Sequence, residues 1–228
     1  MNTNYCIPTS VVDDFFDNPE WVRSWALSLD YEKNSKGAWP GKRSKSLHEI
    51  DPKFFEFVIN RFMSLYYYNG VDLRSADPSF RFSWVARAYF QSVDSSYGEG
   101  WIHRDQNSLI TGIIYLNQDY NLDAGTTIYT RKTGFDIVNQ ETKQGLFKQE
   151  ISYEQAIADL KENQNQFEES VVLKNKFNRL VAFDSGLYHA ASSFIDKEQQ
   201  QDGERLTLVF FIDILNAKKY PIYRMKTF

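Results

Sequence analysis

The pattern of hydrophobic and polar residues changes about one third of the way along the chain of 228 residues. Apolar residues before that point recur at helical spacing, whereas from Phe80 onward short β-rich runs alternate with turn residues. This order predicts helices that buttress a β core, and therefore a mainly β fold with flanking helices. We expect one domain over 1–228, with a helical N-terminal buttress at 1–79, a β core at 80–214 and a C-terminal tail at 215–228.

Two helices are predicted in the N-terminal part, and each begins with a polar capping residue directly before a proline. The segment 18–29 starts with Asn-Pro, and the segment 51–70 starts with Asp-Pro. Apolar side chains at helical spacing give each segment one buried face, and Asn-Gly at 69–70 offers a left-handed end to the second helix.

The β-rich runs bounded by turn residues lie at 80–93, 108–116, 126–130, 170–173, 179–183 and 205–214. Such runs without a helical pattern between them predict a sandwich or barrel. One stretch differs, because Ser152 and Gln155 have the spacing of a capping box. We therefore expect an insertion at about 135–169 that carries a polar helix, and its Gln- and Asn-rich end at 162–166 is predicted to be solvated.

Composition excludes several classes of protein. Apolar residues make up 42% and aromatic residues 16%, which is enough for a sizeable core. The net charge of −4 provides no basic field, so no nucleic-acid partner is expected. Cys6 is the only cysteine, which excludes an intrachain disulfide and predicts a reducing, cytoplasmic location. No apolar run is long enough to span a bilayer, so no membrane partner is expected.

His103 and Asp105 form an H-x-D triplet, and residues two apart on a strand project to the same side. His189 follows the predicted strand 179–184 beyond a Ser-Gly turn, where a third ligand could meet the first two. Two imidazoles and one carboxylate can bind ferrous iron with open positions left for chemistry. The triplet alone is weak evidence, but two of the three histidines fall where a metal centre on a β scaffold needs them; His48 receives no role.

Arg205 begins the last predicted core strand, and Thr207 lies two residues further on the same side. If both side chains point inward, a guanidinium and a hydroxyl offer donors to a carboxylate in a dry pocket. The alternative is a surface arginine that pairs with Glu204 or Asp202.

In this order and spacing, the motifs resemble the iron(II)- and 2-oxoglutarate-dependent dioxygenases, in particular their prolyl 4-hydroxylase-like branch. The segments 113–117, 123–127 and 179–189 carry the resemblance as well, and it covers roughly 89–211. The implied fold is a double-stranded β-helix, a jelly-roll or cupin-like core. The resemblance implies that His103, Asp105 and His189 bind the iron and form the catalytic centre.

Further roles follow from the resemblance alone. Arg205 is implied to bind the far carboxylate of 2-oxoglutarate, with Thr207 assisting, Tyr115 hydrogen-bonding to the same carboxylate and Tyr89 as a further candidate. The implied cofactors are iron(II), 2-oxoglutarate and O2, with ascorbate as an additional candidate. Two features depart from the family pattern: the turn 124–127 reads Ala-Gly-Thr-Thr, and the interval before Arg205 is long, which predicts an extended loop at 196–203.

The activity that the resemblance implies is hydroxylation of an unactivated C–H bond, with release of succinate and CO2. Its substrate would be a prolyl residue in a peptide or protein, or a free amino acid, so the partner is a small molecule or a peptide. The retained Asp105 favours hydroxylation, because related halogenases lose that carboxylate. The loop 92–101 is either a lid or an ordinary connection, and the basic loop 39–43 is placed to edge the mouth of the site.

Two other functions stay open: a catalytically silent β-sandwich for binding or assembly, and a cupin-like metalloenzyme that uses no 2-oxoglutarate. The second would leave Arg205 unexplained, and a silent relative would be expected to have lost a ligand. The oligomeric state is open.

Overall fold

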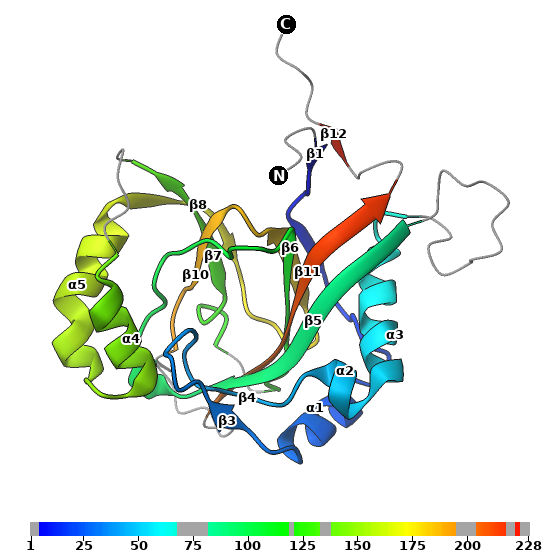
Figure 1. Ribbon diagram of the computed structural model, residues 1–228, viewed down its shortest axis with the longest axis horizontal. Coiled ribbons are helices and arrows are strands. Elements are labelled where there is room, and N and C mark those ends of the chain that lie inside the picture. The colour runs from blue at the N-terminus through cyan, green and yellow to red at the C-terminus, as the bar shows by residue number, and fades with distance from the viewer. Residues whose placement is uncertain are drawn as a thin grey trace, which may run out of the picture.

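The computed structural model describes residues 5–67, 82–118, 121–132, 138–194, 204–217 and 222–223. Its centre is formed by two antiparallel sheets with helices at both ends (Figure 1). The larger sheet has the order β2-β9-β6-β11-β5-β4-β3, and its strands are β2 (Ser10–Val12), β3 (Glu32–Lys33), β4 (Lys42–Arg43), β5 (Phe82–Val93), β6 (Ile110–Tyr115), β9 (Leu180–Asp184) and β11 (Arg205–Ala217). The smaller sheet has the order β10-β7-β8, with strands β7 (Thr126–Arg131), β8 (Phe167–Leu173) and β10 (Tyr188–Ala191). The prediction of a mainly β protein with flanking helices is confirmed.

Both N-terminal helices begin where the capping residues predict. α1 (Pro19–Leu27) starts after Asn18, whose side chain accepts a hydrogen bond from a backbone N–H of the first turn. α3 (Pro52–Met63) starts after Asp51, whose carboxylate accepts two such bonds. α3 ends at Met63, earlier than the apolar pattern suggests, and the expected stop at 69–70 lies outside the described residues. Between them lies the short helix α2 (Leu47–Ile50).

The central strand β11 shows how period two divides a buried strand between a core and a cavity. Leu208 and Phe210 point towards the N-terminal helices, and the Phe210 ring lies 4.9 Å from the Phe62 ring of α3. Arg205 and Val209 point the other way and line a cavity between the sheets. The side chain of Arg205 therefore points inward, as the sequence predicts.

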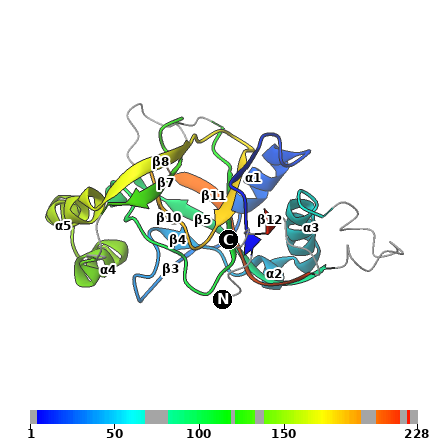
Figure 2. The ribbon, with the colours of Figure 1, turned by 90° about the horizontal axis from the view of Figure 1, so that it is seen from above.

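The insertion contains two helices where one was predicted, α4 (Gln140–Lys148) and α5 (Tyr153–Asn165). The predicted capping box at the start of α5 is present in both directions, between Ser152 and Gln155. Seen from above, α4 and α5 lie at the opposite end of the β core from α1 and α3 (Figure 2). The expectation of a solvated end at 162–166 is wrong at Asn163 and Gln166, which are 1% and 6% exposed. Asn163 also exchanges two hydrogen bonds with the Ile102 backbone.

Several short elements were not predicted. β2, β3 and β4 lie within the part expected to be helical, and Ser95–Tyr97 form a single 3-10 turn in the loop after β5. β11 continues to Ala217, and β12 (Ile222–Tyr223) pairs with β1 (Tyr5–Cys6), so the segment expected to be a tail takes part in a sheet. The predicted loop at 196–203 lies outside the described residues. Within the described residues, the structure has no helix whose length and apolar character suit a membrane span.

Candidate metal centre

The backbone brings His103, Asp105 and His189 together at one end of the space between the two sheets. His103 and His189 form an antiparallel bridge, in which each backbone N–H donates to the other residue's carbonyl at 3.0 and 2.9 Å. The N–H of Asp105 donates to the Ser185 carbonyl in the turn before β10, at 3.0 Å. Main-chain bonds therefore fix all three positions before any ion is bound.

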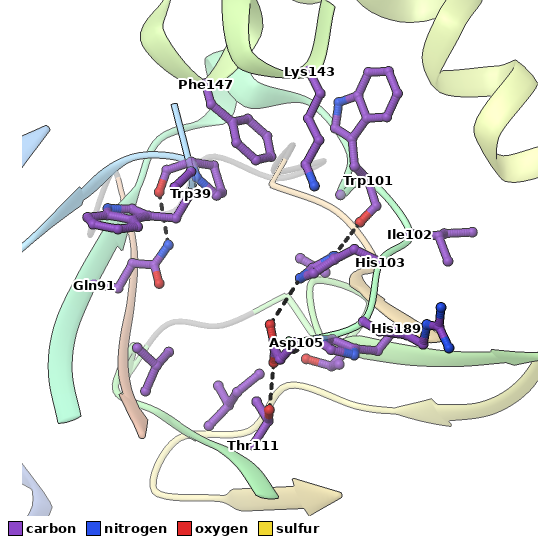
Figure 3. A pocket seen from close by; sticks show the side chains of 18 of the residues that line it. Trp39, Gln91, Trp101, Ile102, His103, Asp105, Thr111, Lys143, Phe147 and His189 are labelled. Atoms are coloured by element: carbon purple, nitrogen blue, oxygen red, sulfur yellow. Dashed lines mark hydrogen bonds and ion pairs between the residues drawn. The ribbon is translucent and has the colours of Figure 1, made fainter. Parts of the chain in front are cut away.

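The three side chains converge on one point (Figure 3). One carboxylate oxygen of Asp105 lies 3.5 Å from His103 Nε2, and the other lies 3.3 Å from His189 Nε2. The Nδ1 atoms face away, at 2.7 Å from the Trp101 carbonyl for His103 and 2.9 Å from the Leu187 carbonyl for His189. Since a carbonyl only accepts, each Nδ1 carries the proton and each Nε2 presents a lone pair.

Two hydroxyl groups hold the carboxylate in place. Thr111 Oγ1 donates to Asp105 Oδ2 at 2.6 Å and lies 2.8 Å from the Ser185 hydroxyl. Sequence reasoning did not assign either residue, although an inward-facing threonine near the start of β6 and the serine of the Ser-Gly turn were visible. Such outer hydrogen bonds orient metal ligands.

Burial and mutual contacts set the protonation states of the centre. Burial, with the neighbouring charge of His189, lowers the pKa of His103 below its ordinary value. Burial opposes ionisation of Asp105, but its electrostatic contacts with His103 and His189 outweigh burial and hold the Asp105 pKa well below its ordinary value. A neutral imidazole and an ionised carboxylate are the forms that a divalent metal requires, so the donor set fits ferrous iron.

Arg205 lies in the same cavity as the three ligands and is 9% exposed. Its Nε donates to the Ala124 carbonyl at 3.1 Å, while Nη2 is buried without a hydrogen-bond partner among the described residues. The guanidinium carbon lies 5.2 Å from the Tyr115 ring and 5.8 Å from the Phe194 ring. Burial lowers the Arg205 pKa, and a buried cationic donor of this kind calls for an anionic acceptor.

The unusual turn 124–127 keeps the one glycine that its geometry requires. A Cβ on Gly125 would lie 2.0 Å from the Leu173 carbonyl oxygen of β8, so only glycine permits this approach. The adjacent Ala124 carbonyl is thereby placed against Arg205. The sequence Ala-Gly-Thr-Thr at 124–127 is therefore compatible with the hydrogen bond between Arg205 and the Ala124 carbonyl.

The other residues expected at the cosubstrate site are not among those that line the cavity; Tyr115 and Thr207 lie near Arg205, whereas Tyr89 pairs with Val209 further along β11. Tyr115 is 1% exposed, and its hydroxyl lies 2.9 Å from Thr126 Oγ1. Thr207 is fully buried beside it in the sheet and donates to the Gln91 carbonyl at 3.4 Å. The Tyr89 ring lies 5.4 Å from the Arg43 guanidinium. Their part in cosubstrate binding stays a prediction.

The cavity has a volume of about 600 Å³ and extends from the metal ligands to Arg205 and outward to three peripheral segments. The loop 39–43 contributes Trp39 and Arg43 to the lining, and its place at the mouth stays a prediction. Trp101 comes from the loop 92–101, and Lys143 and Phe147 come from α4. Sequence reasoning missed both α4 residues, because they belong to a helix that was not predicted.

The sequence profile of a family described as "Family of unknown function (DUF6445)" matches residues 4–212. No curated protein matches the chain. Among solved structures, HygX from Streptomyces hygroscopicus with nickel and 2-oxoglutarate bound is 13% identical, with a TM-score of 0.52 over 92% of this chain and 83% of that one. A Trichoplax adhaerens prolyl hydroxylase in complex with a hypoxia inducible factor peptide fragment is 12% identical, with a TM-score of 0.50 over 92% and 84%. At this identity the likeness concerns the fold alone, and it confirms the predicted jelly-roll core.

Proposed function

The chain belongs to DUF6445, a family of unknown function, and we propose that it is an iron(II)- and 2-oxoglutarate-dependent dioxygenase that hydroxylates a C–H bond. One observation carries this proposal. The donor set of His103, Asp105 and His189 shares one cavity with Nη2 of the buried Arg205, which has no hydrogen-bond partner among the described residues. A keto acid that chelates a metal with one end and has a carboxylate at the other needs both features.

Each residue has a defined task in this proposal. His103, Asp105 and His189 would hold the iron, and Thr111 keeps the Asp105 carboxylate oriented. Iron(II) with 2-oxoglutarate and O2 supplies the oxidising chemistry, which yields succinate, CO2 and a hydroxylated product. Arg205 binds the far carboxylate of the keto acid. The aromatic walls exclude water, so that the oxidant meets the substrate.

The substrate class is a finer inference. HygX has been solved with hygromycin B bound, and the Trichoplax enzyme with a peptide fragment, so this fold accommodates both small molecules and peptides. We infer that this chain acts on a free amino acid, another small molecule or a prolyl residue in a peptide. Ascorbate is a candidate additional reductant, and the single Cys6 still predicts a reducing, cytoplasmic location.

The two other functions are less well supported. A silent binding module has no need of three converging metal ligands, two of them histidines whose Nδ1 protons are directed away from the centre. A cupin-like metalloenzyme without 2-oxoglutarate leaves the buried Arg205 Nη2 without an acceptor.

The proposed activity is tested by measuring succinate formed from 2-oxoglutarate in the presence of Fe(II) and O2, across free amino acids and short proline-containing peptides. We expect succinate above the background of Asp105→Ala, which removes a ligand. Asp17→Ala is the matched control, because Asp17 makes only an exposed ion pair with Arg61, and it should keep full activity. Equal succinate formation by the wild type and Asp105→Ala would contradict the proposal.

A further inference from the structure

The cavity contains more positive than negative charge. Among the described residues that line it, Asp105 is the single carboxylate, whereas the cationic residues are Arg43, Arg87, Arg104, Lys143 and Arg205. This excess is local, because the whole chain has a net charge of −4. A cavity with one sign of charge attracts a ligand of the opposite sign.

Three of the five cations already have a partner or a task. Arg87 makes two hydrogen bonds with the Asp213 carboxylate, at 2.7 and 2.9 Å. The Arg104 guanidinium lies 4.8 Å from the centre of the Tyr188 ring. Arg205 is assigned to the keto acid. Lys143 and Arg43 remain.

Lys143 projects into the cavity from α4. It shares one face of that helix with Gln140 and Phe147, since spacings of three and four residues place side chains side by side. In Figure 3 it passes between Phe147 and Trp101 with its ammonium group directed towards His103. Lys143 forms no ion pair with a described carboxylate. Burial lowers its pKa, because the charged ammonium group is unfavourable away from water, and a bound anion would stabilise that charge.

The Arg43 guanidinium is positioned by contacts with uncharged side chains. Its guanidinium lies 4.4 Å from the Trp39 ring centre, and its Nε and Nη2 donate to Gln91 Oε1 at 3.1 and 3.0 Å. The Gln91 amide in turn donates to the Pro40 carbonyl at 2.9 Å. No described carboxylate pairs with Arg43, so its positive charge also acts on the cavity.

We propose that the substrate carries a carboxylate or phosphate that is bound by Lys143 within the positive potential of Arg43, while its apolar body packs against Phe147 and Trp39. The inference rests on the proposed function, and it narrows the substrate to a small anionic molecule. The cavity of about 600 Å³ has the size of an ordinary ligand site. α4 of the insertion is thus a recognition element for substrate.

The test compares three probes by isothermal titration calorimetry, anaerobically, without and with Fe(II) and 2-oxoglutarate. They are 3-phenylpropionate, phenyl phosphate and the neutral 3-phenylpropanamide. We expect at least one anion to bind about tenfold or more tightly than the amide, because a hydrogen bond to a charged group is lost in the amide. The tighter of the two anions identifies a carboxylate or a phosphate as the recognised group.

Lys143→Met should remove this preference, and Lys143→Arg should retain most of it. Lys148→Met is the matched control, since Lys148 lies on the same helix, outside the cavity lining, and forms an ion pair with the exposed Glu150 at 3.7 Å. The inference is overturned if neither anion binds to the wild type, if the amide binds equally well, or if Lys143→Met retains the preference. Failure of 2-oxoglutarate to bind, with the anion preference intact, would instead count against the proposed function.

Discussion

In the buried guanidinium of Arg205, Nε donates a hydrogen bond to the Ala124 carbonyl, whereas Nη2 has no hydrogen-bond partner among the described residues. A buried cation in that condition is unfavourable unless a ligand completes it. At the residue scale, the proposed cosubstrate therefore explains an otherwise costly feature. The orientation of the two histidine rings has a similar meaning, because the hydrogen bonds from Nδ1 to backbone carbonyls leave each Nε2 lone pair directed at the proposed metal position.

Arg205→Gln should raise the dissociation constant for 2-oxoglutarate about tenfold to a hundredfold, since it removes charge-assisted hydrogen bonds. Fe(II) affinity should stay within about twofold, because the ligands are untouched. Equilibrium dialysis measures both. Arg61→Gln, which breaks an exposed pair with Asp17, is the control. Unchanged affinity for 2-oxoglutarate would show that Arg205 is not its anchor.

Thr111→Val keeps the shape of the side chain but removes the hydroxyl that donates to Asp105. We expect Fe(II) affinity to fall about tenfold to a hundredfold, the usual effect of losing an outer hydrogen bond to a ligand. Thr130→Val, on the neighbouring sheet with an exposed hydroxyl contact to Ser170, should have no effect. Equal iron affinity in both variants would mean that Thr111 does not position the carboxylate.

At the scale of elements, the predicted helices with a strong capping signal are present. The strand that carries His189 is the element with the least local sequence signal. β10 has four residues and carries His189, yet its pairing with β7 depends on partners some sixty residues away. α4 was missed because its sequence is largely polar. Its inward face becomes recognisable only once the cavity it lines is formed.

Asp51→Ala removes the carboxylate that accepts two backbone hydrogen bonds at the start of α3. The free energy of unfolding should fall by about 1 kcal/mol, and the melting temperature by roughly 2–4 °C for a chain of this size. Differential scanning calorimetry measures this change. Iron affinity should not change, because α3 packs on the opposite face of the larger sheet from the cavity. A loss of iron binding would mean that the helical layer sets the geometry of the site.

Asp13 joins the turn after β2 to the segment before β9, through hydrogen bonds from Arg179 and Lys176. These bonds lower its pKa from 3.8 to about 2, so its stabilisation is present above 3.8 and is lost as the pH falls through about 2. The side chain is 37% exposed, so solvent screening limits the effect to below about 1 kcal/mol. Urea unfolding of Asp13→Asn should show a deficit at neutral pH that shrinks over this interval. A deficit independent of pH would contradict this origin.

At the scale of the whole molecule, the two sheets hold the site, the N-terminal helices support the larger sheet from behind, and the insertion covers the far end (Figures 1 and 2). Period-two runs and turn residues are local signals, and they predicted a sandwich or barrel. The jelly-roll core was implied only by the resemblance of the ordered motifs to a known family. The charge of the cavity could not be predicted in this way. Lys143, Arg43 and Asp105 lie far apart in the sequence, and only the packed fold shows that their charges share one space.

The most direct measurement of the central claim is anaerobic titration of the protein with Fe(II) and 2-oxoglutarate, followed in the visible spectrum. A keto acid that chelates iron(II) gives a weak metal-to-ligand charge-transfer band. The wild type should develop this band with saturable dependence on both components, and His103→Ala should not develop it. Absence of the band in folded wild-type protein, or its persistence in His103→Ala, would contradict the assignment of this site.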